Sequence, residues 1–121
     1  MENSVDLLTL NNSLMNYLDK ISVKFDEVKE SKEKGNFYLE VKPFADEVKE
    51  VNDKWKMVAI EWIKNRNPKN LHEKQIESAY EQIELLSVQA FYPDTSKTRF
   101  INYFQTVRFI LLSINDQIEK K

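Results

Sequence analysis

Apolar residues recur at alternating steps of three and four along four long segments, and this spacing constrains the fold more than any other feature of the sequence. An α-helix has about 3.6 residues per turn, so residues spaced in this way form one narrow edge of a helix. No segment shows the period of two that a half-buried strand requires. The four predicted edges are Leu7, Leu14, Leu18, Ile21, Phe25 and Val28; Phe37, Val41, Phe44, Val48, Val51, Trp55, Val58 and Trp62; Ile76, Ala79, Ile83, Leu86 and Ala90; and Phe100, Phe104, Val107, Leu111, Ile114 and Ile118.

Short polar stretches separate these segments and predict how the helices are connected. Residues 65–70 and 92–96 contain prolines and small polar side chains, which are typical of loops. Short loops place successive helices side by side and antiparallel. The sequence therefore predicts an all-α, antiparallel up-and-down four-helix bundle that forms a single domain over residues 1–121.

Individual residues refine the expected helix ends. Gly35 follows a lysine-rich segment and is expected to end the first helix in a left-handed conformation. Pro43 is expected in the first turn of the second long helix, after a turn or kinked extension over residues 37–42. Asn70 and Glu73 have the spacing of a capping box, which predicts that the third helix starts there. One of residues 94–96 should cap the fourth helix.

Composition excludes several classes of function. The chain has one glycine and no cysteine in 121 residues, so it lacks glycine-rich phosphate loops, thiol nucleophiles and thiolate metal sites. A net charge of −2 gives no field that would attract nucleic acid or an anionic membrane. The longest strongly apolar run is residues 109–112, far short of the roughly 20 residues of a membrane span. We therefore expect a cytoplasmic protein that binds neither nucleic acid nor membrane.

Histidine and the acidic residues offer little support for a metal centre. His72 is the only histidine, and Lys69 occupies the position where a Glu-x-x-His motif of a dimetal bundle would have its carboxylate. We expect His72 to be a partly buried residue near the start of the third helix. No acidic residue falls on a predicted edge, so the sequence predicts no metal, no cofactor and no catalytic residue.

One enzymatic alternative rests on the acidic residues. Five carboxylates echo the E-E-x-x-E … E-x-x-D pattern of all-α nucleoside triphosphate pyrophosphatases, which bind Mg²⁺ through such groups. Helical spacing from the predicted edges turns all five toward solvent, which favours an ordinary charged surface instead. These carboxylates are Asp26, Glu27, Glu30, Glu50 and Asp53.

Basic residues gather around the predicted loop at residues 65–70. The start of the following helix adds unpaired backbone N–H groups, which favour an anion. We expect this basic loop to bind a phosphate, another anion or the carboxylates of an acidic partner. The side chains assigned to it are Lys64, Arg66, Lys69 and His72.

The fourth segment is apolar on more than one side. If Val107 and Leu111 point inward, helical spacing turns Phe109 and Leu112 away from the core. Exposed apolar residues on a helix mark a surface that another protein can cover. Phe109 and Leu112 are therefore predicted to contact a protein partner or a second copy of the chain.

The centre of the sequence resembles a known family. Residues 62–76, with the sequence WIKNRNPKNLHEKQI, look like the helix–loop–helix centre of the YppE-like proteins, and Val41-Lys42-Pro43 and Lys97-Thr98-Arg99-Phe100 resemble the same family. These are small, uncharacterised helical proteins of Bacillus-type bacteria. The resemblance implies an all-α four-helix fold and no assigned activity. Together with the surface features, it leads us to expect a non-enzymatic interaction or regulatory module.

Overall fold

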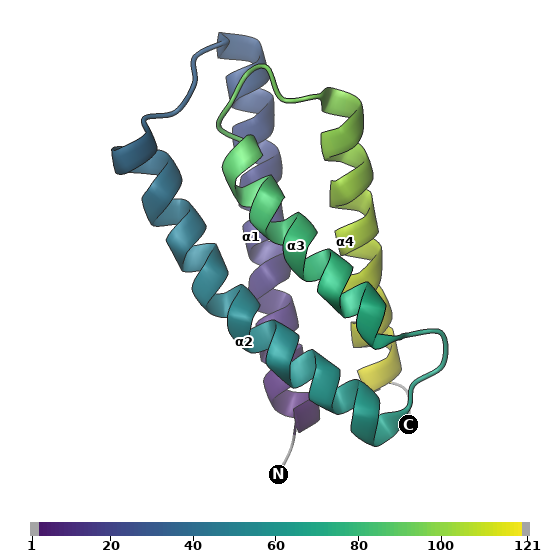
Figure 1. Cartoon of the computed structure of the whole chain (residues 1–121). Coiled ribbons are helices and arrows are strands. Elements are labelled where there is room, and N and C mark those ends of the chain that lie inside the picture. Colours follow the sequence, from purple (N-terminus) through teal and green to yellow (C-terminus); the bar gives the residue numbers. More distant parts are fainter. Residues whose placement is uncertain (1–2, 120–121) are drawn as a thin grey trace.

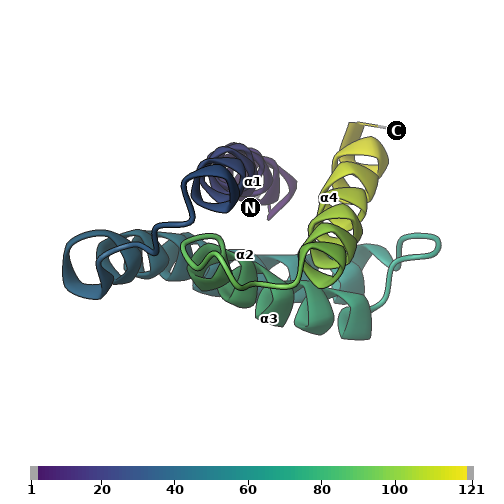
Figure 2. The ribbon, with the colours of Figure 1, turned by 90° about the horizontal axis from the view of Figure 1, so that it is seen from above.

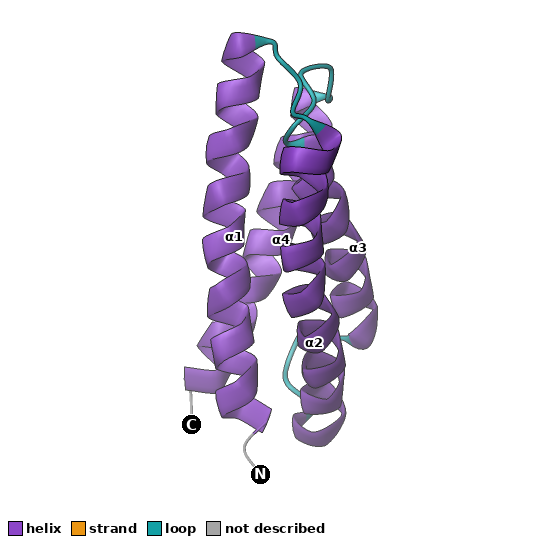
Figure 3. Cartoon of the chain, turned by 90° about the vertical axis from the view of Figure 1, so that its left-hand side faces the viewer, coloured by secondary structure: helices purple, strands orange, loops and turns teal. Residues whose placement is uncertain are grey.

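The computed structural model describes residues 3–119, and this part of the chain is helical without a strand (Figure 1, Figure 3). Its long helices are α1 (Asn3–Ser31), α2 (Lys42–Arg66), α3 (Glu73–Gln89) and α4 (Lys97–Glu119). A short π-helical turn, η1 (Phe37–Val41), immediately precedes α2. The predicted all-α class is confirmed over the described residues.

The four helices pack as a bundle around one core. Each helix contacts the next in the chain, and α1 also contacts α4. Seen from above, α1 and α4 lie over a second layer that α2 and α3 form (Figure 2). The first turn of α1 lies at the same end of the bundle as the loop between α2 and α3, whereas the other two connections lie at the opposite end (Figure 1).

The predicted helix edges form the core. Every predicted edge residue except Phe37 is buried or half-buried. Phe25 of α1 and Phe100 of α4 stack with ring centroids 3.8 Å apart. This contact packs the C-terminal end of α1 against the N-terminal end of α4. Ile63, Leu71 and Phe91, which lie near the connections between helices, are also buried, as is Ile110 in the middle of α4. These residues complete the core that the predicted edges begin.

The prediction for Gly35 is wrong in its conformation. Lys32 is the residue with a positive φ, 64°, at the end of α1, and its N–H bonds to the carbonyl of Val28. Gly35 is needed for space instead. Its N–H donates to the carbonyl of Phe91, and a Cβ at this position would lie 2.8 Å from Phe91 Cδ1. A glycine therefore allows the connection to lie directly on the core aromatic ring.

The start of α2 explains why Phe37 leaves the predicted edge. Pro43 lies in the first turn of α2, as predicted. The preceding residues form η1, whose wider turn changes the angular position of each side chain relative to α2. Val41 is still buried, but Phe37 is 48% exposed, so its assignment to the core is wrong.

The predicted capping box of α3 is displaced by two residues. Asn70 has a left-handed backbone with φ of 63°, and α3 begins after His72, whose N–H donates to Gln75 Oε1 at 2.7 Å. For α4 the prediction is confirmed, because Ser96 Oγ accepts from the N–H of Arg99 at 3.2 Å. Such caps satisfy the free N–H groups of a helix start.

Buried amides link the helices within the apolar core. Asn11 of α1 is fully buried, accepts a 2.9 Å hydrogen bond from Trp55 Nε1 of α2 and donates to the carbonyl of Leu111 in α4. Its amide also donates to Asn115 Oδ1 at 2.8 Å. In α2 the fully buried Asn52 donates to the carbonyl of Tyr80 in α3. These directional bonds fix the positions of helices that apolar contacts alone would leave free to slide.

Candidate functional site

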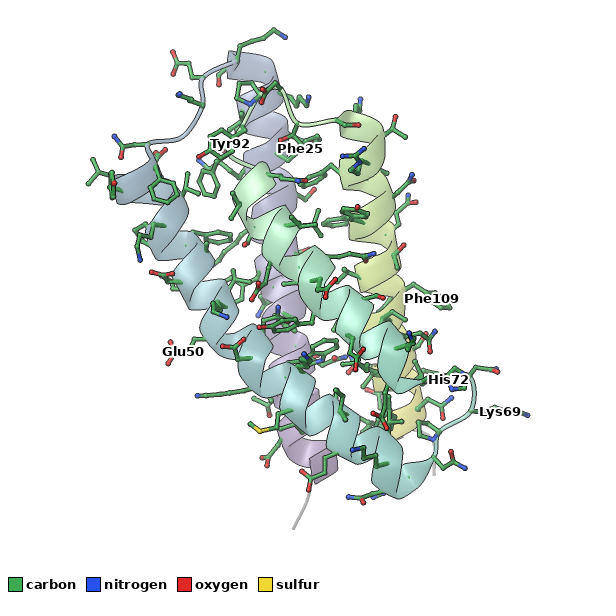
Figure 4. The ribbon with its side chains drawn as sticks, in the orientation of Figure 1. Phe25, Glu50, Lys69, His72, Tyr92 and Phe109 are labelled. Atoms are coloured by element: carbon green, nitrogen blue, oxygen red, sulfur yellow. The ribbon has the colours of Figure 1, made fainter. Side chains whose placement is uncertain are left out.

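The outward face of α4 carries the first candidate surface. Phe109 is 66% exposed and Leu112 is 41% exposed, whereas the neighbouring Ile110 and Leu111 are buried. Helix α4 packs against α1 on one side and α3 on the other, so the direction away from both is open. Figure 4 shows Phe109 projecting outward from the bundle. The predicted outward orientation of Phe109 and Leu112 is confirmed, and their contact with a partner stays a prediction.

The basic loop between α2 and α3 is the second candidate surface. All four of its predicted side chains are exposed. His72 was expected to be partly buried, and this is wrong, because the N-cap position holds its side chain outside the helix barrel. The binding of an anion by this exposed loop stays a prediction. They are Lys64, Arg66, Lys69 and His72.

Two left-handed asparagines and hydrogen bonds to backbone carbonyls fix the path of this loop. Asn67 and Asn70 both have positive φ, a conformation that asparagine tolerates better than most residues. The N–H of Asn67 donates to the carbonyl of Ile63 and closes the end of α2. Gln117 Nε2 of α4 donates to the carbonyl of Lys69 at 3.1 Å, so the basic loop is attached to the last turns of α4.

The two candidate surfaces therefore lie near each other. Figure 4 shows Phe109, His72 and Lys69 projecting on the same side of the molecule. The bond between Gln117 and the loop places the basic side chains beside the C-terminal half of α4.

The five carboxylates of the pyrophosphatase alternative do not converge. All five side chains are exposed, and Glu50 points away from the bundle (Figure 4). Over residues 3–119, no group of three or more histidine, aspartate or glutamate side chains is arranged to hold a metal ion. The structure thus offers no arrangement that supports magnesium chemistry by Asp26, Glu27, Glu30, Glu50 and Asp53.

A polar cluster between α2 and α3 has no counterpart in the sequence interpretation. Lys49 Nζ lies 3.4 Å from Tyr80 Oη, which donates a 2.5 Å hydrogen bond to Asp53 Oδ1. Lys49 also pairs with Glu84 of α3 at 3.4 Å. The bond from Tyr80 lowers the pKa of Asp53 and raises the pKa of Tyr80, while bonding to Tyr80 contributes most to the raised pKa of Lys49. The four-residue spacing of Lys49 and Asp53 in the sequence is typical of an ion pair within one helix, and the structure contains this pair. Their partners in α3 cannot be found from spacing, because they depend on how α2 and α3 pack.

The turn η1 forms a further exposed apolar feature. Tyr38 and Leu39 are 77% and 78% exposed beside the half-exposed Phe37. The turn is held in shape by Asn36, whose Oδ1 accepts from the N–H of Leu39 and whose N–H donates to Glu40 Oε1. A depression of about 290 Å³ beside it is lined by both lysine and glutamate side chains and by Phe91. This mixture of charges defines no single class of ligand.

Comparison with known proteins places this bundle in a class of small bacterial proteins of four helices. Residues 11–118 match the family described as bacterial domain of unknown function DUF1798, and the chain belongs to this family. The resemblance to the YppE-like proteins is thereby confirmed. The uncharacterized protein YppE of Bacillus subtilis (strain 168) is 28% identical over 118 residues, which cover 98% of this chain and 96% of YppE.

Solved structures agree with this assignment. The crystal structure of YppE from Bacillus subtilis has a TM-score of 0.89 at 29% identity, and the match covers 95% of this chain and 94% of YppE. A DUF1798 protein from Staphylococcus aureus has a TM-score of 0.86 at 25% identity, covering 93% and 96% of the two chains. A protein of unknown function from Listeria innocua has the same fold, with a TM-score of 0.92 at 24% identity over 98% of this chain and 94% of that one.

None of the helices over residues 3–119 has both the length and the apolar character needed to cross a bilayer. The family carries no assigned activity, so it adds a fold and a set of relatives but no chemistry.

Proposed function

We propose that this protein is a non-enzymatic protein-binding module of the cytoplasm, with the outward face of α4 as its main contact and the basic loop as a second contact for acidic groups. The observation that carries the proposal is the exposure of Phe109, 66%, on a helix whose other sides are already covered by α1 and α3. Large aromatic side chains contribute strongly to protein interfaces when they become buried. The same side chain contributes little to the fold while it is exposed.

The proposal includes an antiparallel up-and-down order of the helices. It is supported by the short connections at residues 67–72 and 90–96 and by the contacts between successive helices. In this order the basic loop and the last turns of α4 share one end of the bundle, in keeping with the hydrogen bond from Gln117 to the loop. The basic residues Lys97 and Arg99 belong to the opposite end and serve as controls.

Site-specific photo-crosslinking tests the apolar contact. A photoreactive phenylalanine analogue replaces Phe109 in one protein and Met57 in a control, because both side chains are 66% exposed but lie on different helices. We expect a discrete crosslinked protein in native cytoplasm from position 109 only. Excess unmodified protein should suppress a product formed with a different protein, and excess protein carrying Leu112→Asp should not. Equal labelling from positions 57 and 109 would count against the α4 face.

The basic loop is tested separately by titration with inorganic phosphate and with a glutamate-rich peptide. Trp62 is 3% exposed and lies two residues before Lys64, so its fluorescence reports changes at this end of α2. Replacing Lys64 and Lys69 together by alanine should abolish a saturable response. Replacing Lys97 and Arg99 by alanine should leave it intact. The basic loop has no such role if the wild-type protein gives no response, or if both double variants respond equally.

A further inference from the structure

The outward face of α4 carries an ordered pattern of charge as well as apolar surface. Arg108, Leu112 and Asp116 follow one another at steps of four, and all three are exposed. Residues at this spacing form a continuous ridge on a helix. Phe109 lies beside the ridge, three residues before Leu112. The ridge therefore has a positive end, an apolar centre and a negative end.

The charge pattern of this ridge is complementary to the same ridge on a second, antiparallel copy of α4. Arg108 and Asp116 are equally far from Leu112, at four residues or about 6 Å along the helix axis on either side. If two α4 helices pack antiparallel with Leu112 at the centre, each Arg108 faces Asp116 of the other copy. If they pack parallel, like charges face each other. Ridges of residues at steps of four pack against each other in the helix crossing that is commonest in globular proteins, near −50°.

We propose that a second copy of this chain occupies the outward face of α4 and forms a two-fold symmetric dimer around Leu112. This inference rests on the proposed function, since it names the partner of the same surface. Two ion pairs then flank a centre in which Leu112 meets its equivalent and each Phe109 is covered. Two-fold symmetry requires such a self-complementary patch, in which residue i contacts j and j contacts i.

The internal contacts of the chain are compatible with this arrangement. Asp116 already makes a contact within its own chain, and a carboxylate has enough acceptor positions to serve a second donor. Phe109 and Leu112 lie outside the core, so covering them requires no repacking of the bundle. An interface made by one helix face is small, and we therefore expect reversible association that depends on protein concentration.

Sedimentation over about 10 µM to about 1 mM tests the proposal, because small interfaces are weak. The weight-average mass of the wild type should rise from 14.4 kDa toward twice that value. Arg108→Glu and Asp116→Arg each place like charges in both pairs, so each should weaken self-association by about tenfold or more. An equimolar mixture of these two variants has opposite charges in both pairs, and it should associate like the wild type. Lys97→Glu, at the far end of α4, is the control for a changed net charge.

Circular dichroism shows that each variant is folded before its mass is interpreted. The proposal is overturned if the wild type stays at 14.4 kDa throughout, if either single variant associates like the wild type, or if the mixture remains monomeric. A monomeric wild type that still crosslinks another protein through position 109 overturns the dimer and leaves the proposed function intact. If position 109 crosslinks neither a second copy nor another protein, both the dimer and the proposed function fail.

Discussion

Replacing Asn11 with leucine tests how the buried amide holds three helices together. Asn11 is fully buried, and its side chain bonds to Trp55 in α2 and to Leu111 and Asn115 in α4. Leucine has the same number of side-chain heavy atoms in the same branched shape, so the change removes hydrogen bonds without opening a cavity. The indole N–H of Trp55 then lacks its acceptor inside the core.

The expected loss of stability follows from these bonds. A buried donor left without a partner costs about 1–3 kcal/mol, and the lost bonds from the amide of Asn11 cost about 1 kcal/mol more. Burying leucine in place of an amide returns roughly 1 kcal/mol, which leaves a net loss of about 2 kcal/mol. For 121 residues the entropy of unfolding is about 0.25 kcal/mol per degree. The midpoint of thermal unfolding should therefore fall by about 8 °C.

Urea and thermal unfolding followed by circular dichroism measure this loss, with Asn16→Leu on the exposed side of α1 as the control. A double-mutant cycle with Trp55→Phe isolates the bond itself. Once the indole N–H is absent, Asn11→Leu should cost about 1–2 kcal/mol less than in the wild type. Additivity within about 0.5 kcal/mol would refute the reasoning, because it would mean that the bond contributes no coupling.

Two further changes test local features of the fold. Gly35→Ala should destabilise the protein by about 1–3 kcal/mol in urea unfolding, since the new Cβ would lie 2.8 Å from Phe91 Cδ1; Lys34→Ala should have little effect. Hydrogen bonding from Tyr80 lowers the pKa of Asp53 in the folded protein. The stability that this hydrogen bond gives the folded protein is therefore fully present above the pKa of about 3.9 of an unfolded aspartate. It is lost as the pH falls through the lower pKa of Asp53 in the folded protein. Tyr80→Phe should reduce stability at pH 7, and the difference from wild type should shrink toward pH 2; a constant difference would contradict this assignment.

The helices and their core faces could be predicted because both follow from spacing along one helix. The angular position of Val107 relative to Leu111 is fixed by the helix itself, whatever the partner helices do. The same local rule placed Phe109 and Leu112 outside the core, and the structure agrees. Asn11 falls between Leu7 and Leu14 at the spacing of the first predicted edge. The sequence gives no sign of its hydrogen bonds, because the positions of Trp55 and Leu111 depend on how three helices pack.

The connections were harder to predict because the spacing of residues no longer fixes the direction of their side chains where the α-helix ends. Phe37 keeps the correct spacing to Val41, yet the π-helical turn rotates it into solvent. The position of Gly35 after a lysine-rich segment predicts a left-handed conformation. The structure instead shows that a glycine is needed for space beside Phe91, a residue far away in the sequence. Such contacts between distant segments arise from tertiary packing, which local patterns do not encode.

The candidate surfaces show the same division between local and distant information. The order Arg108, Leu112, Asp116 can be read from the sequence, since a helix fixes which residues share a ridge. The sequence does not predict that the basic loop lies beside the last turns of α4. The hydrogen bond from Gln117 to Lys69, which are 48 positions apart, shows this only in the structure. A ridge on one helix can serve as a binding surface only where the bundle leaves it uncovered. Because α1 and α3 cover the other sides of α4, the bundle itself selects this ridge as the part of the helix that a partner can reach.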